Sequence, residues 1–127
     1  MTDCLDSWAI LRWLEGVEPA ASRVEVALVS RPVMSWINLG EVAYIVERMA
    51  GTVRSRQVVR ELQHQLSLDL PTEARVLEAA HIKAVHAMAY ADSFAVATAI
   101  AYDCTLLTGN PELLDGNPAW PTLDLRP

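Results

Sequence analysis

Four polar residues stand where apolar segments of this sequence give way to helices. Asp6 directly follows the first apolar segment, and Glu41 lies in the first turn of the helix after the second. Asp92 opens an alanine-rich helix, and Asn110 follows the last strongly apolar segment. In open parallel sheets, ligands bind outside the carboxyl ends of the strands. We therefore expect three carboxylates and one amide to converge on one edge of a single sheet.

Such a cluster predicts a metal site. Carboxylates held close together repel one another, and their proton affinity rises unless a cation neutralises them. With oxygen ligands alone the cation would be hard, namely Mg²⁺, with Mn²⁺ able to take its place. Such an ion polarises a phosphoryl group, lowers the pKa of a bound water and positions both for in-line attack. The expected chemistry is hydrolysis of a phosphodiester.

Each position also has a purely structural interpretation. Asp6 and Asp92 would cap the helices that follow them, and Asn110 would stabilise a turn. Asn38 and Glu41 match a capping box, in which the third helical residue reaches back to the cap amide. Capping alone does not select the convergence of three acids and an amide at one end of a sheet.

Apolar runs alternate with amphipathic helical stretches along the chain, which is typical of an α/β domain built on a parallel sheet. We expect a three-layer α/β/α sandwich with a four- to five-stranded, mainly parallel sheet, formed by residues 1–127 as a single domain. The expected strands are Thr2–Leu5, Arg31–Ser35, Leu68–Leu70, Cys104–Leu107 and Thr122–Leu125. The expected helices are Ser7–Glu15, Pro19–Val29, Asn38–Ala50 ending at Gly51, Thr52–Leu66, Thr72–Ala87 and Tyr90–Tyr102.

Composition and charge exclude several classes of protein. The chain has 127 residues, and its 10 Lys and Arg against 16 Asp and Glu give a net charge of −6. This balance excludes a basic module that holds nucleic acid by bulk phosphate neutralisation. No apolar run reaches the roughly 18 residues of a membrane-spanning helix, and Asp3 and Asp6 stand where a secretory signal would be basic and then apolar. We expect no membrane partner and a cytoplasmic location.

The remaining reactive side chains add no second centre. Cys4 and Cys104 have neither a zinc spacing nor a disulfide framework, so we expect two reduced thiols in or near the core. His64, His81 and His86 fall on predicted helices, and none forms a recognisable pair of nucleophile and base. We expect surface or packing roles for all three.

Four motifs occur in a fixed order, within residues 5–11, 35–42, 90–99 and 106–111. With these motifs the sequence resembles PIN-domain ribonucleases, and specifically the VapC toxins of bacterial toxin–antitoxin pairs. Each motif is weak alone, but the set spans nearly the whole chain and is specific. The resemblance implies a PIN-like α/β/α fold and endonucleolytic cleavage of RNA, such as tRNA or rRNA, that depends on Mg²⁺ or Mn²⁺.

The resemblance also implies roles for individual residues. Asp6, Glu41 and Asp92 would be the metal-binding acids that activate water for attack on the scissile phosphate. The Ser7 hydroxyl would lie beside the first acid, and Thr108 would hydrogen-bond into the same cluster.

One residue departs from the family. Members commonly have Asp where this sequence has Asn110. An amide oxygen can still be a metal ligand, but it lacks the negative charge that helps to hold a second ion. Glu112 would supply that carboxylate if its turn points inward. We expect at least one bound ion and leave a two-metal mechanism open.

The family also implies partners. Members usually act as homodimers, held inactive by a VapB-like antitoxin whose C-terminal segment lies in a groove and blocks the site. Trp8, Trp13 and Trp36 lie close in sequence to the acids, so they either line that groove or pack in the core.

Two other functions compete with an active ribonuclease. Asn110 permits a catalytically impaired PIN domain that acts by binding RNA or an antitoxin. A phospho-acceptor signalling domain also has this length and places acids around Mg²⁺ at strand ends. That fold needs a lysine near the end of a late strand, whereas Lys83, the only lysine, lies in a predicted helix.

Overall fold

The computed structural model describes residues 3–116 and 119–127 and has one parallel sheet. Its strands lie in the order β3-β2-β1-β4-β5, and every neighbouring pair is parallel. The strands are β1 (Asp3–Leu5), β2 (Val33–Ser35), β3 (Ser67–Asp69), β4 (Thr105–Thr108) and β5 (Thr122–Asp124). Each therefore ends at the same edge of the sheet, as the sequence predicted. The expected first strand began at Thr2, which lies outside the described residues.

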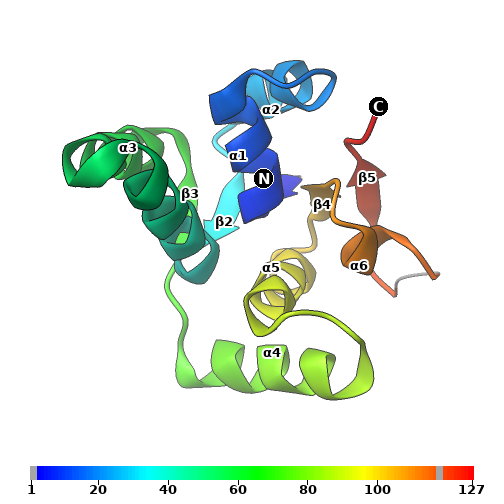
Figure 1. Ribbon diagram of the computed structural model, residues 1–127. Helices are drawn as coiled ribbons and strands as arrows, with labels where there is room; N and C mark the ends of the chain where they lie inside the picture. Colours follow the sequence, from blue (N-terminus) through cyan, green and yellow to red (C-terminus); the bar gives the residue numbers. More distant parts are fainter. Residues whose placement is uncertain (1–2, 117–118) are drawn as a thin grey trace.

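Helices carry the chain back from each strand to the next (Figure 1). Two of them follow β1, one joins β2 to β3, two precede β4 and a short one precedes β5. In chain order they are α1 (Ser7–Glu15), α2 (Ala20–Leu28), α3 (Trp36–Gln65), α4 (Glu73–Val85), α5 (Tyr90–Ala101) and α6 (Pro111–Leu114). In Figure 1, α4 runs along the bottom beneath α5, whereas α3 lies at the left and α2 at the top.

The sheet separates two apolar cores, because successive side chains of a strand point to opposite faces. Leu5 and Leu107 belong to the core that contains buried residues of α1, α2 and α3. Their chain neighbours Cys4 and Leu106 belong to the core that contains residues of α4 and α5. Both predicted thiols are buried, and no disulfide joins them. The expected three-layer sandwich is confirmed.

α5 is the most buried helix of the sandwich. Residues 92–99 are all buried, as its nearly uniform apolar composition predicted. In the described ranges, no single helix is long and apolar enough to cross a bilayer, and only α4 and α5 taken together, at an angle of 116°, reach that length and composition.

α3 consists of two segments, residues 36–50 and 52–65, that meet at Gly51. Gly51 has φ 89° and ψ 169°, which a residue with a side chain rarely adopts. The sequence predicted a helix end at this glycine. Beyond the break, the buried Ser55 donates a hydrogen bond to the carbonyl of Ala43 at 2.7 Å. This bond holds the start of the second segment against the first.

Two helix starts differ from expectation. α3 begins at Trp36 rather than Asn38, because the Ser35 hydroxyl at the end of β2 accepts the Ile37 N–H at 3.1 Å and caps the helix. The capping-box interpretation of Asn38 and Glu41 is therefore wrong. In addition, the segment after Asn110, expected to be only a turn, forms the short helix α6.

Candidate active site

Asp6 lies at the centre of the carboxyl edge of the sheet. Its side chain is 1% exposed. Oδ1 accepts the Ala9 N–H at 2.9 Å, so Asp6 does cap α1. Oδ2 accepts a hydrogen bond from the hydroxyl of Thr108, the last residue of the adjacent β4. Asp6 therefore caps α1, as the structural interpretation predicted, and its carboxylate also faces the neighbouring strand.

Glu41 connects three helices. The Ser7 hydroxyl of α1 donates to Glu41 Oε1 at 3.0 Å, and Asn38 Nδ2 donates to the same oxygen at 3.2 Å. Asn38 Nδ2 also donates to the carbonyl of Ala91 in α5 at 3.0 Å. Ser7 therefore contacts the second acid rather than the first, contrary to expectation. Its position at the start of α1 directs its hydroxyl toward α3.

Asn38 is a site residue that the sequence interpretation did not assign. It is fully buried and lies one helical turn before Glu41, on the same side of α3. The sequence signal for this role is an amide three residues before Glu41, in a helix that begins at the carboxyl edge of a sheet.

Asp92 stands in the first turn of α5, but it does not cap the helix. The N-cap position is occupied by Ala89, so the capping interpretation of Asp92 is wrong. Asn110 Nδ2 donates to Asp92 Oδ2 at 3.0 Å. The oxygen of the same amide accepts the Glu112 N–H at 3.0 Å and caps α6. Asn110 thus presents its nitrogen, and not its oxygen, to the acid.

Glu112 does not enter the carboxylate cluster. Its side chain is exposed, and its carboxylate accepts the Ala89 N–H at the start of α5 at 3.2 Å. Its negative charge still acts on Asp92, because it contributes to raising the pKa of that acid.

The loop after β4 fits only a glycine at position 109. A Cβ atom there would lie 2.2 Å from the ring of Trp8. The ring thus packs against the backbone between Thr108 and Asn110, the two residues that hold Asp6 and Asp92. Trp8, Trp13 and Trp36 are all partly buried against the core of α1, α2 and α3, which supports the packing alternative for the tryptophans.

The acids carry uncompensated negative charge. Burial is the main cause that raises the pKa of Asp6, from 3.8 to about 7, while its hydrogen bonds to Thr108 and Ala9 act in the opposite direction. Burial, followed by the charge of Glu41, raises the pKa of Asp92. In the described part of the chain, no Lys or Arg side chain forms an ion pair with any of the three acids.

This donor set fits a hard divalent cation. Desolvated carboxylates without a cationic partner are stabilised by a metal ion, and only oxygen ligands are available here. The buried Oδ1 of Asn38, beside Glu41, has no hydrogen-bond partner within the described residues. In the described ranges, no three His, Cys, Asp or Glu side chains lie close enough together, as they are arranged here, to bind one metal ion. Mg²⁺ is commonly held by one or two carboxylates, with water and substrate phosphate as its other ligands.

Comparison with known proteins identifies the family. A family profile described as PIN domain matches residues 4–115. This chain belongs to the PIN-domain family. A comparison with curated proteins found no match.

Solved structures share the fold of this PIN domain at low sequence identity. DNA-bound VapBC from Salmonella typhimurium has a TM-score of 0.78 and 20% identity, with 99% of each chain covered. VapBC2 from Rickettsia felis, bound to a DNA fragment from its promoter, has a TM-score of 0.76 and 14% identity, with 98% of each chain covered. VapC20 from Mycobacterium tuberculosis, a toxin that cleaves the sarcin-ricin loop, has a TM-score of 0.70 and 12% identity, and the match covers 87% of this chain and 91% of VapC20.

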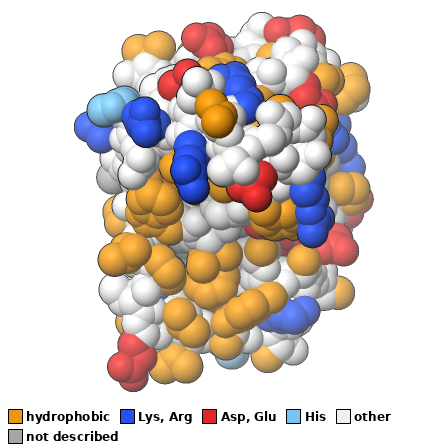
Figure 2. Space-filling view, turned by 60° about the vertical axis from the view of Figure 1, so that its left-hand side comes forward, with side chains coloured by type: hydrophobic (Ala, Val, Ile, Leu, Met, Phe, Trp, Pro, Cys, Tyr) orange, Lys and Arg blue, Asp and Glu red, His pale blue; other side chains and the backbone are white. Residues whose placement is uncertain are grey.

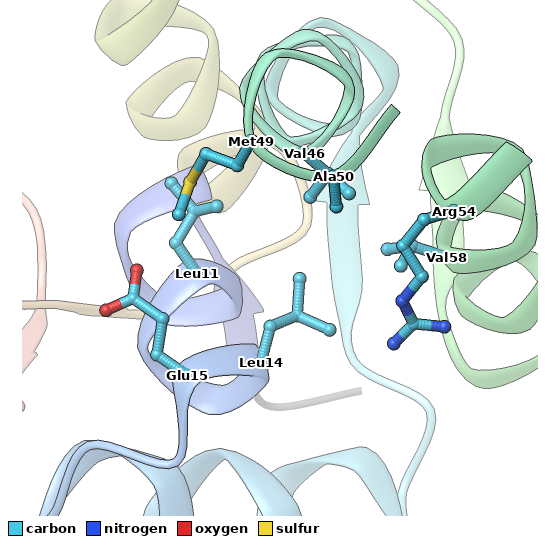
Figure 3. A pocket seen from close by; sticks show the side chains of 8 residues that line it. All are labelled: Leu11, Leu14, Glu15, Val46, Met49, Ala50, Arg54 and Val58. Carbon is cyan, nitrogen blue, oxygen red and sulfur yellow. The ribbon is translucent and has the colours of Figure 1, made fainter. Parts of the chain in front are cut away.

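The PIN domain also has an apolar groove apart from the acids. α1 and both segments of α3 enclose a volume of about 190 Å³ on either side of the break at Gly51 (Figure 3). Figure 3 shows aliphatic side chains between the carboxylate of Glu15 and the guanidinium of Arg54. The groove is lined by Leu11, Leu14, Glu15, Val46, Met49, Ala50, Arg54 and Val58. None of the acids or tryptophans discussed above lines it.

Proposed function

We propose that this PIN domain is a magnesium-dependent endoribonuclease and the toxin of a type II toxin–antitoxin pair, with tRNA or rRNA as its substrate. The observation that carries the proposal is the buried Asp6 beside Asp92 and Glu41, with no ion pair to any of the three acids among the residues that the structure describes. Three acids in this state are costly unless they hold an ion.

Asp6, Glu41 and Asp92 would hold Mg²⁺ or Mn²⁺, with Asn110 outside the ligand set because its amide nitrogen faces Asp92. The bound ion would polarise the scissile phosphate and lower the pKa of an attacking water. The chain's own part is to fix the acids. Thr108 holds Asp6, and Ser7 and Asn38 together hold one oxygen of Glu41.

These supporting hydrogen bonds leave ligand oxygens available. Ser7 and Asn38 both donate to Oε1 of Glu41, and the Asn110 amide donates to Oδ2 of Asp92. The second carboxylate oxygen of Glu41 can therefore bind an ion, a water or the proton that the attacking water loses. Outer donors of this kind typically change metal affinity or activity by about 10- to 100-fold when removed.

A VapB-like antitoxin is the partner that we propose for the inhibited state. The similar structures from Salmonella typhimurium and Rickettsia felis are themselves VapBC complexes. The groove between α1 and α3 is apolar enough to receive a partner's side chains. A basic segment would complement the acidic site beyond it.

We also propose a homodimer that buries the outer face of α4 and α5. Leu77, Val85 and Ile100 on these helices are each more than half exposed. Figure 2 shows hydrophobic side chains over the lower half of the molecule, the half to which α4 belongs. Sedimentation of the wild type and of Leu77→Glu tests this, with a dimer expected for the first and a monomer for the second.

Cleavage of structured RNA by the purified protein tests the proposed activity. We expect cleavage with Mg²⁺ and none with EDTA. Asp6→Asn should lose about 1,000-fold in rate, because several kcal/mol of charge stabilisation disappears. Asn is as good a helix cap as Asp, so α1 should remain intact.

Glu41→Gln and Glu47→Gln form a matched pair for the same assay. Both remove one acid from α3, but Glu47 is exposed and is not among the charges that raise the pKa of Asp6 or of Asp92. We expect only Glu41→Gln to lose cleavage. Equal cleavage by the wild type, Asp6→Asn and Glu41→Gln would refute the assignment.

Asn110 supports a second candidate, a PIN domain that binds RNA or antitoxin without cutting. Its amide occupies one oxygen of Asp92 and adds no charge for a second ion. This candidate predicts RNA binding without turnover at any Mg²⁺ concentration, and turnover by the purified wild type excludes it. The phospho-acceptor alternative is disfavoured because Lys83 lies in α4 and donates to the carbonyl of Met88 at 2.8 Å.

A further inference from the structure

Glu41, Tyr44 and Arg48 lie on one side of the first segment of α3, because residues three and four apart are neighbours on a helix. Tyr44 is 48% exposed, and Arg48 is exposed as well. The Arg48 guanidinium lies over the Tyr44 ring, 5.0 Å from its centroid. An exposed aromatic ring thus lies one helical turn from a proposed metal-binding acid, and a cation lies one turn further along the helix.

Positive charge is concentrated along the same helix. Residues 48–65 contain four Arg and one Glu, although the whole chain has a net charge of −6. Among the described residues, Arg48, Arg56 and Arg60 have no carboxylate partner, whereas Arg54 pairs with Glu61 at 3.9 Å. Figure 2 shows Lys and Arg side chains mostly over the upper half of the molecule, where α3 lies.

The fold also brings the start of the second segment of α3 close to Tyr44. The hydrogen bond from Ser55 to the carbonyl of Ala43 holds the second segment of α3 against the residue that precedes Tyr44. Arg54 and Arg56 flank Ser55 in the chain, so their backbone is held near that point.

We propose that this face of α3 binds the RNA strand next to the scissile phosphate, with a base stacked on Tyr44 and a backbone phosphate on Arg48. The inference rests on the proposed function and names the surface that holds its substrate. Proteins recognise unpaired RNA by stacking bases on aromatic rings and Arg planes. An acidic protein needs a local group of arginines to hold a polyanion.

The charge of this face favours RNA over a protein partner. A segment that complements the acidic site is basic, and Arg48 on this face would repel it. The acids and the arginines therefore suit different ligands. RNA can use both, since its phosphates bind a metal ion at the acids and guanidinium groups on α3.

Binding of a single-stranded RNA that contains 2-aminopurine tests the proposal. The protein carries Asp92→Asn and the buffer contains Mg²⁺, so that binding is measured with cleavage impaired. We expect the fluorescence of 2-aminopurine to be quenched on binding, as a base stacked on a ring would be. Tyr44→Leu should remove the quenching and weaken binding roughly 5- to 100-fold, whereas Tyr44→Phe should retain both.

Arg48→Gln tests the phosphate contact through its dependence on salt. Loss of one phosphate contact should lower the slope of log affinity against log salt by about 0.7 for a single strand. Arg23→Gln is the matched control, because Arg23 is an exposed arginine of α2 without a carboxylate partner in the described ranges. The slope should be unchanged in this control.

The outcomes separate this inference from the proposed nuclease. Quenching that depends on Tyr44, in a wild-type protein that never cuts RNA, supports the inference and refutes the nuclease. Cleavage by the wild type, with unchanged RNA binding and salt slope in Tyr44→Leu and Arg48→Gln, overturns the inference alone. Binding of a basic peptide that is lost in Tyr44→Leu, while RNA binding by this variant is unchanged, overturns the inference in favour of a protein partner.

Discussion

Two buried aspartates stand at the carboxyl ends of strands in this PIN domain, and their surroundings differ in one respect. Asp69 ends β3 and accepts hydrogen bonds from Arg75 Nε at 2.9 Å and from the Tyr102 hydroxyl at 2.9 Å. Asp6 follows β1 and, among the described residues, accepts hydrogen bonds from two neutral donors, the Thr108 hydroxyl and a backbone N–H. Within the described ranges, Asp69 has a cationic partner and Asp6 has none.

This difference separates an acid whose charge is balanced within the fold from one whose charge is not. Asp69 raises the pKa of Arg75 and of Tyr102, so its charge is used within the fold, where it joins β3 to α4 and to the end of α5. Burial instead raises the pKa of Asp6 to about 7, and the nearby acids add to the effect. An acid of the second kind is stabilised by a cation from solution.

The largest expected effect on stability comes from the acid that has its own cation. Asp69→Asn should destabilise the protein by about 3–5 kcal/mol, because the partly buried Arg75 loses its partner. Urea denaturation at neutral pH measures this, and Mg²⁺ should not restore the loss. A change below about 1 kcal/mol would show that Arg75 finds sufficient compensation in Glu78, with which it also pairs.

The acid without a cationic partner should make the stability of the protein depend on pH. Its folded-state pKa of about 7 lies above the ordinary 3.8, so the folded state retains a proton that the unfolded state releases between these values. The contribution of Asp6 to stability should therefore fall by a few kcal/mol as pH rises from about 4 to about 7.

Denaturation of the wild type and of Asp6→Asn in EDTA, across that range, isolates this contribution. We expect the difference in unfolding free energy to shift steadily against the wild type as pH rises. Saturating Mg²⁺ should remove much of the shift, since the ion offsets the charge. A constant difference across the range contradicts the assignment of Asp6 as an uncompensated acid.

A smaller effect should follow from disturbing the loop that presents Thr108 to Asp6. Gly109→Ala would place a methyl group 2.2 Å from the Trp8 ring, so we expect a loss of about 2 kcal/mol. Gly40→Ala is the matched control, because a Cβ atom there meets nothing within 4 Å and Ala favours a helix. Thermal denaturation of both compares them, and equal midpoints would mean that Trp8 moves aside freely.

The sequence predicted the strands, the sheet and the edge at which the acids meet, because apolar runs and helix breakers are local signals. Asp6 and Asp92 could be assigned to that edge without knowing their partners. The contacts of Ser7 and Asn38 with Glu41 depend on how α1, α3 and α5 pack, and spacing within one helix does not encode this packing. Likewise, Asp69 and Asp6 look alike in sequence, and only the fold brings Arg75 to one of them.

Replacing Asn110 by the acid that is common in the family should increase the unbalanced negative charge of the site. Asn110→Asp removes a hydrogen-bond donor of Asp92 and adds a negative charge at the same place. The metal-free protein should lose stability, whereas the affinity for Mg²⁺ should rise, so that RNA is cut at a roughly tenfold lower Mg²⁺ concentration.

Asn110→Ser, which removes the amide without adding charge and can still cap α6, separates the two effects. Mg²⁺ titrations of cleavage and of thermal stability compare the three proteins. An unchanged Mg²⁺ dependence in Asn110→Asp would show that position 110 lies outside the reach of the ion, and that Asp6, Glu41 and Asp92 set the metal affinity without it.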